Sequence, residues 1–197
     1  MLILIGASAS GKSNIAKLLI KDYHFEKVVT TTTRNKRPGE INHIDYHFTT
    51  KKRFLKKKAK GQFLETVTYD QEYYGTPKDE AGLNKVLIVD PAGANSIYYH
   101  HIEHVVFFFL TAREEVRKER MLDRGDTLIQ IIDRLEKDHA HFKKDHLVHI
   151  DYIVDTSDDS LEELTYKIAM LYHNHIHNDN QMSIYDVFRN DERDKIK

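Results

Sequence analysis

The chain of 197 residues contains no cysteine, which excludes disulfides, thiolate metal sites and a cysteine nucleophile. It also lacks any apolar run close to the roughly 20 residues that a membrane-spanning helix needs. The N-terminus passes directly from Met1 into an apolar segment, without the basic stretch and small-residue cleavage site of a secretion signal. These absences predict a cytoplasmic protein that does not engage membranes.

Strong net charge is also missing, because the formal charge at pH 7 is -1. This near-neutral balance argues against a general polyanion binder, and we expect no nucleic-acid partner. Basic residues are nonetheless concentrated at 34–37 and again at 51–60. The second run is typical of a solvated helix face, although it could also attract phosphorylated substrates or, as a third interpretation, nucleic acid.

The segment from Gly6 to Ser13 fits the phosphate-binding P-loop pattern G-x-x-x-x-G-K-[ST]. It lies between an apolar run and a helix-like segment, which is the context that this motif requires. Glycines let backbone N–H groups turn toward phosphate oxygens, and the helix N-terminus adds its dipole. Lys12 is expected to reach the β- and γ-phosphates, and Ser13 to hold Mg²⁺. The residues predicted to bind the donor phosphates are Gly6, Ala7, Ser8, Ala9, Ser10, Gly11, Lys12 and Ser13.

Predicted strands and helices alternate along most of the chain. We expect strands at 1–5, 27–31, 86–90, 105–110 and 151–155, and helices at 13–22, 114–124, 127–143 and 161–172. The all-apolar runs among them suit parallel strands that are buried on both faces. This order predicts an α/β fold with a doubly wound parallel sheet that begins with the P-loop.

The stretch from about 33 to 80 differs in composition and is predicted to be an inserted lobe. It should contain strands at 46–48 and 63–69, and a helix at 50–60 that Thr49 or Thr50 caps. The predicted core is then 1–32 and 81–172. After about residue 173 the chain becomes polar, which predicts a poorly packed tail at 173–197 with a short helix near 185–189.

A second group of residues suggests a phosphorylated acceptor. Arg34 and Arg37 are three residues apart beside a Pro-Gly turn, so both guanidinium groups can reach one phosphate. Tyr46 adds a hydroxyl donor. Further on, Glu65 offers a carboxylate that can accept from two adjacent N–H groups, which guanine presents and adenine does not.

With these motifs in order, the sequence resembles the guanylate kinase family over residues 1–172. The family pattern runs from the P-loop through S-x-T-T-R-x-x-R-x-G-E-x-x-G-x-D-Y-x-F, F-[IL]-E and Y-Y-G-[ST] to D-x-x-G. The matching segments here are 30–48, 63–65, 73–76 and 90–93. Arg120, Arg124 and Arg134 resemble the arginines of the family's lid, which places the lid at about 120–136.

The resemblance implies ATP-dependent phosphorylation of GMP, with Mg²⁺ as cofactor. It implies GMP binding by Thr30, Arg34, Arg37, Tyr46, Glu65, Tyr74, Thr76 and Asp90. Lys12, Arg124 and Arg134 would be catalytic, and Asp90 would assist Ser13 at the metal through water. The oligomeric state stays open.

Several positions depart from the family pattern. His43 replaces a usual Gly, Thr30 a Ser, Thr66 a common Trp, and 111–112 a common Pro-Pro. Ile88 stands where many members have the first Asp of D-x-D. Thr66 and Ile88 bear on the acceptor pocket, whereas the P-loop, both acceptor arginines and Glu65 are intact.

Two other functions stay open at this stage. A related kinase could phosphorylate another nucleotide or a sugar phosphate through the same arginine pair, without Glu65 as a guanine reader. A guanylate-kinase-like interaction module is the non-enzymatic alternative, although such modules tend to have degraded P-loops. The histidines that alternate at 173, 175 and 177 lack the acidic or cysteine partners of a structural metal site.

Overall fold

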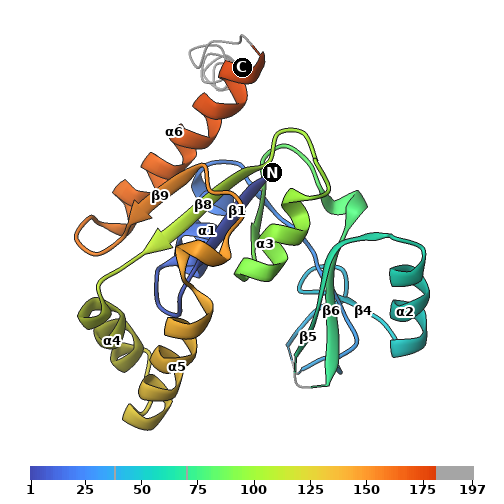
Figure 1. Cartoon of the computed structure of the whole chain (residues 1–197), viewed down its shortest axis with the longest axis horizontal. Helices are drawn as coiled ribbons and strands as arrows, with labels where there is room; N and C mark the ends of the chain where they lie inside the picture. Colours follow the sequence, from blue (N-terminus) through green and yellow to red (C-terminus); the bar gives the residue numbers. More distant parts are fainter. Residues whose placement is uncertain (38, 70, 181–197) are drawn as a thin grey trace.

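The computed structural model describes residues 1–37, 39–69 and 71–180. A five-stranded sheet in the order β2-β7-β1-β8-β9 forms the core, and all its neighbouring strands are parallel (Figure 1). The strands are β1 (Leu2–Gly6), β2 (Glu26–Lys27), β7 (Lys85–Ile88), β8 (Val106–Thr111) and β9 (Tyr152–Asp155). On one side of β1 the chain forms the edge strand β2 and then β7 between β2 and β1; on the other side it adds β8 and then β9. This order confirms the predicted doubly wound sheet.

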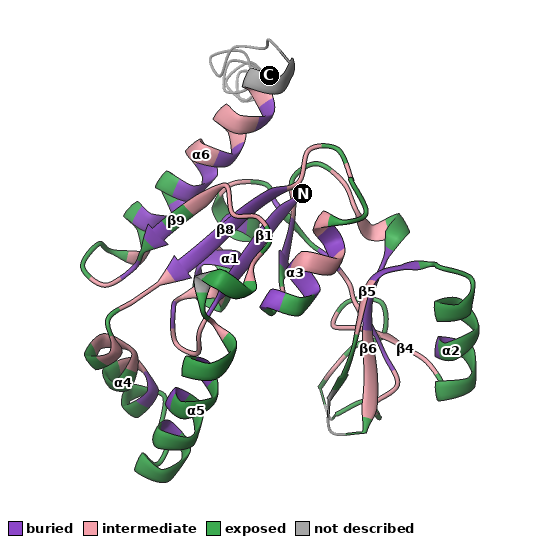
Figure 2. Ribbon diagram, in the orientation of Figure 1, coloured by how far each residue is buried: buried purple, intermediate pink, exposed green. Residues whose placement is uncertain are grey.

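Helices cover both faces of this sheet. Helices α1 (Lys12–Asp22) and α6 (Leu161–Asn180) pack on one face, and α3 (Pro91–Tyr98) packs on the other. Leu2 and Leu4 point toward α1 and α6, whereas Ile3 and Ile5 point toward α3. Strand β1 is therefore buried on both faces, as its colour in Figure 2 shows.

The inserted lobe forms a second sheet to one side of the core, in the order β4-β3-β6-β5 (Figure 1). Its strands are β3 (Thr31–Thr32), β4 (His47–Phe48), β5 (Phe63–Tyr69) and β6 (Glu72–Pro77). Helix α2 (Lys51–Ala59) begins after Thr50, whose hydroxyl accepts from the Arg53 N–H. Phe54 anchors α2 by stacking on Phe63 and Tyr73, with ring centroids 4.6 and 5.4 Å away.

A helical pair protrudes from the core after β8. Helices α4 (Glu114–Asp123) and α5 (Leu128–His141) share a small core of Met121, Ile131 and Leu135. Thr127 starts α5 with a capping box, in which its side chain and that of Gln130 each bond the other's backbone N–H. Short 3₁₀ turns at Lys78–Glu80 and Lys144–His146 complete the elements of the described residues.

Three sequence expectations need correction. The predicted strand at 27–31 is two short strands, because β2 joins the core sheet and β3 joins the insert sheet. The last helix continues past residue 172 to Asn180, since Ile176 still packs into the core. The second sheet includes residues 31–32, slightly before the predicted start of the insert, while the predicted helix at 185–189 lies outside the described residues.

In the part of the chain that the structure describes, no helix combines the length and apolar character needed to cross a bilayer.

Candidate active site

The P-loop leaves β1 through a glycine that no other residue could replace without a shift. Gly6 has φ 152°, and a Cβ built on it would lie 2.3 Å from the Leu110 carbonyl oxygen of the neighbouring strand. Gly11 has φ 89° and forms the N-cap of α1. These two glycines place the loop across the N-terminus of α1, where backbone N–H groups and the helix dipole favour an anion.

Lys12 is folded onto this loop. Its Nζ donates to the carbonyl oxygens of Gly6 and Ala7, both at 2.6 Å. Burial lowers the pKa of Lys12 to about 8, with Asp138 raising it and Arg117 lowering it by smaller amounts. Near neutral pH the ammonium is therefore charged, but it is poised to lose its proton more easily than an exposed lysine.

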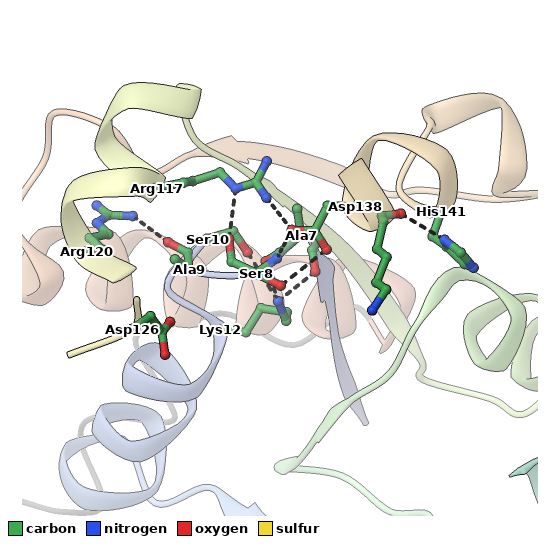
Figure 3. A network of polar contacts seen from close by, with 12 residues as sticks. Ala7, Ser8, Ala9, Ser10, Lys12, Arg117, Arg120, Asp126, Asp138 and His141 are labelled. Atoms are coloured by element: carbon green, nitrogen blue, oxygen red, sulfur yellow. Dashed lines mark hydrogen bonds and ion pairs between the residues drawn. The ribbon is translucent and has the colours of Figure 1, made fainter. Parts of the chain in front are cut away.

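Asp138 of α5 reaches the outer side of the P-loop (Figure 3). Its carboxylate accepts from the Ser8 N–H at 2.9 Å and from the Ser8 hydroxyl at 3.2 Å. Arg117 of α4 pairs with the same carboxylate and donates its Nε–H to the Ser8 carbonyl at 2.8 Å. The two helices that follow β8 are thereby fixed to the loop through a nearly buried ion pair.

A cavity of about 720 Å³ opens beside the loop. Ser13 and Arg124 line it, together with Arg120 and Thr156. Arg120 bonds the Ala9 carbonyl at 3.2 Å and the Thr156 hydroxyl at 3.1 Å. The volume of the cavity lies in the range of small-molecule sites, and the cationic side chains that line it suit a polyphosphate.

The arginines predicted for the lid differ in their surroundings. Arg124 lines the cavity and pairs with Asp126. Arg134 is exposed on α5 and is not among the residues lining that cavity, although its charge acts on the same Asp126 carboxylate. Asp126 therefore pairs with Arg124 near the junction of α4 and α5 and feels the charge of Arg134.

Part of the predicted acceptor group comes together in the insert. Arg34 makes a two-pronged ion pair with Glu40, at 2.7 and 3.0 Å, and lies 5.4 Å from the Tyr46 ring centroid. The Tyr46 ring in turn lies edge-on to the ring of Tyr74, with centroids 6.2 Å apart. The Arg34 guanidinium lowers the pKa of Glu40 to about 2, so this pair is charged at neutral pH.

A second part lies where the insert meets the core. Glu65 of β5 accepts from the Thr76 hydroxyl of β6 at 2.7 Å. Burial raises the pKa of Glu65, and the negative charge of Asp90 raises it further. Asp90 follows β7 and caps α3 by accepting from the Gly93 N–H at 2.7 Å.

Two predicted acceptor residues are less closely engaged. Among the described residues, Arg37 is bonded through its backbone: its N–H donates to the Glu40 carboxylate at 2.7 Å and its carbonyl accepts from the Glu40 N–H at 3.2 Å, while its charge acts on the same carboxylate. Thr30 uses its carbonyl to accept from the His47 N–H at 2.9 Å. Neither side chain is hydrogen-bonded to the other predicted acceptor residues in the described part of the chain.

The sequence interpretation missed Asp138, Arg117 and Thr156. One signal was present for Asp138, because it falls on the apolar stripe that Ile131, Leu135 and Phe142 define along α5. A carboxylate on a buried stripe requires a partner. The sequence around Arg117 and Thr156 contains no comparable signal, since no local pattern indicates that these residues face the P-loop.

A P-loop on the first strand, a basic cavity beside it and an inserted lobe with clustered arginine and tyrosine define a P-loop kinase of a small acceptor. The comparisons narrow this class. The sequence profile described as guanylate kinase matches residues 1–174. The chain belongs to the guanylate kinase family.

Individual relatives agree with this assignment. The chain is 33% identical over 166 residues to a guanylate kinase of Rickettsia bellii, covering 81% of this chain and 86% of the relative. It is 34% identical over 164 residues to one from Aster yellows witches'-broom phytoplasma, covering 78% and 77%. The crystal structure of guanylate kinase from Anaplasma phagocytophilum has TM-score 0.58 and 24% identity, over 93% of this chain and 87% of that one, and this likeness supports the fold.

Proposed function

We propose that the chain transfers the γ-phosphoryl group of ATP to GMP, giving ADP and GDP. The observation that carries the proposal is the pairing of a complete P-loop with the half-buried Glu65 carboxylate and its buried partner Thr76 in the insert. The first holds a donor polyphosphate, and the second offers an acceptor-only carboxylate to a base edge with two adjacent donors.

On the donor side, the loop N–H groups and Lys12 bind the β- and γ-phosphates. Lys12 then exchanges its carbonyl partners for phosphate oxygens, which keeps its ammonium charged. Phosphoryl transfer depends mainly on positioning and charge neutralisation, so these groups act where charge develops. Arg124, and Arg134 after a movement of α5, close over the transferred group.

Guanylate kinases use ATP with a divalent metal, and we assign Mg²⁺ to Ser13. Ser13 lies in the first turn of α1 and lines the donor cavity. A single hydroxyl fits this ion, because Mg²⁺ takes most of its ligands from phosphates and water. The ion would neutralise phosphate charge, and Asp90, which caps α3, would assist Ser13 in holding it through water.

On the acceptor side, Arg34, Arg37, Tyr46 and Tyr74 hold the GMP phosphate, and Glu65 with Thr30 and Thr76 reads the base. Glu40 already orients the Arg34 side chain, so less conformational entropy is lost when Arg34 binds the GMP phosphate. The acceptor oxygen is thereby placed in line with the γ-phosphorus, while closure of the insert excludes water.

An ADP-release assay with ATP and Mg²⁺ tests this proposal against a panel of acceptors. The panel contains GMP, AMP, CMP, UMP and a sugar phosphate, with Lys12→Ala as the inactive control. We expect turnover with GMP that Lys12→Ala reduces by orders of magnitude. Turnover confined to another acceptor would support the related-kinase alternative, and no turnover with any acceptor would support a binding module.

A further inference from the structure

A second cavity, of about 540 Å³, lies in the insert. Thr31 of β3 lines it and pairs with Gly75, whereas the adjacent Thr32 pairs with Tyr74. Because successive strand residues point to opposite faces, the cavity lies on the α2 face of the sheet and Tyr74 lies on the other. Thr76 shares the Tyr74 face, so this cavity is separate from the proposed GMP site.

Three cations of α2 and the lysine at its C-cap face the cavity. Arg53, Lys56, Lys57 and Lys60 line it, and their spacing of i, i+3, i+4 and i+7 places them on one side of the helix. The stripe spans about 10 Å at 1.5 Å per residue. None of the four side chains forms an ion pair within residues 1–37, 39–69 and 71–180. Like charges at this spacing repel one another, so an anion that binds among these four side chains would relieve the repulsion.

The inner wall supplies polar groups that are already ordered. His47 Nδ1 lies 2.8 Å from His43 Nδ1, and His47 Nε2 lies 3.1 Å from Glu80 Oε1. Glu80 also binds Lys85 at 3.2 Å, so its charge is already engaged. The Thr31 hydroxyl is fully buried and has no hydrogen-bond partner among the described residues, which leaves a donor and an acceptor at the cavity wall.

We propose that this cavity binds a small molecule carrying a diphosphate or triphosphate group. The four lining cations outnumber the two carboxylates of the wall, Asp79 and Glu80, so a ligand with at least two negative charges balances the site. The length of the stripe suits a chain of phosphates rather than one. The volume also leaves room for a nucleoside attached to that chain.

Inorganic tripolyphosphate is the first probe, at about 0.15 M salt to limit diffuse attraction. In ¹⁵N-labelled protein, the α2 amides and the His43 and His47 ring signals report this cavity, while the amides of residues 6–13 report the P-loop. We expect both sets to shift in a saturable way. Lys56→Gln/Lys57→Gln should weaken the α2 response about tenfold or more and leave the P-loop response unchanged.

Two further variants distinguish binding at this cavity from diffuse attraction to the positive charge of α2. Lys52→Gln/Lys58→Gln removes the same charge from the same helix at residues that do not line the cavity, and should change affinity less than about twofold. Thr31→Val removes only the hydroxyl and should also weaken the α2 response. Tighter binding of GTP than of tripolyphosphate at the α2 signals would assign a nucleotide, and equal binding would assign the polyphosphate itself.

The proposal is overturned if the α2 and imidazole signals show no saturable shift. Equal weakening by the two double variants would also overturn it, because the binding would then be diffuse. A single-stranded RNA that binds more tightly than tripolyphosphate and depends on Lys52 and Lys58 as well would indicate a nucleic-acid surface instead. Kinase turnover of both double variants should equal that of the wild type.

Discussion

At the scale of single residues, the protonation of Lys12 couples donor binding to pH. Burial holds its pKa at about 8, and a bound triphosphate should raise it again. At a pH above the pKa of Lys12 in the nucleotide-free protein, the binding of ATP must therefore be accompanied by the uptake of a proton. The affinity for ATP should then fall by up to about tenfold per pH unit above pH 8.

Calorimetry in two buffers of different ionisation enthalpy measures this uptake directly. Little uptake is expected at about pH 7.5, and close to one proton at about pH 9. Lys12→Met, which cannot titrate, should bind weakly and lose the dependence. Identical proton uptake by the wild type at both pH values would show that Lys12 does not meet the phosphates.

Arg34 is the acceptor residue that the structure positions most firmly. Arg34→Ala should raise the KM for GMP by about 10- to 100-fold, because a charge-assisted, two-pronged contact is lost. The KM for ATP should barely change. Arg113→Ala is the matched control, since Arg113 makes a similar two-pronged pair with Asp158 at an exposed position. A variant that weakened ATP and spared GMP would reverse the assignment of the two sites.

At the scale of elements, the Arg117–Asp138 pair joins α4 and α5 to the P-loop. Asp138→Ala would leave Arg117, whose side chain is 12% exposed, without its partner, and should cost about 3 kcal/mol of unfolding free energy. The double variant Arg117→Met/Asp138→Leu should recover most of this loss, because an apolar pair avoids the buried charge. Urea unfolding compares the three proteins. Equal stability of Asp138→Ala and the wild type would mean that the pair does not hold the helices to the loop.

Strands and helices with a clear local sequence pattern could be predicted, whereas the elements against which they pair or pack could not. The strand predicted at 63–69 has the bounds of β5, and the apolar periodicity of the helix predicted at 127–143 identified Ile131 and Leu135 on the core face of α5. Leu128 and Ile132 share that periodicity but are exposed. The β-branched run at 27–31 indicated a strand, but propensity does not say which sheet each half joins. The polar composition after residue 172 hid the buried Ile176 and thus the end of α6.

The same division holds for the site. The P-loop and the Arg34 and Glu65 motifs carry local spacing that the sequence displays. Contacts such as Asp138 with Ser8 join residues 130 positions apart, and no local pattern specifies them. The split of the acceptor residues between Arg34 and Glu65 clusters likewise depends on how β3, β5 and β6 pair.

At the scale of the whole molecule, the topology predicts closure. The P-loop, Asp90 and the α4–α5 pair all follow parallel strands, so they lie at one edge of the core sheet. The insert stands to one side of the core and α4–α5 to the other (Figure 1). Transfer needs both nucleotides in one water-excluded space, so the insert and α4–α5 should approach each other.

Small-angle scattering measures this movement. The radius of gyration should fall when GMP and a non-hydrolysable ATP analogue are both bound, and should fall less with either alone. Arg34→Ala under the same ligand concentrations is the control, because it should reduce the compaction by weakening GMP. Unchanged scattering with both nucleotides bound would contradict the closure.

The central claim is that the chain phosphorylates GMP because Glu65 reads guanine, and kcat/KM for GMP against AMP tests it most directly. Adenine would present a ring nitrogen to the half-buried Glu65 carboxylate and leave polar groups unpaired in the closed site, so GMP should be preferred by at least about a thousandfold. Glu65→Gln should lower this ratio by reducing kcat/KM for GMP. A kcat/KM for AMP that equals or exceeds the value for GMP would contradict the account, while leaving the P-loop kinase fold in place.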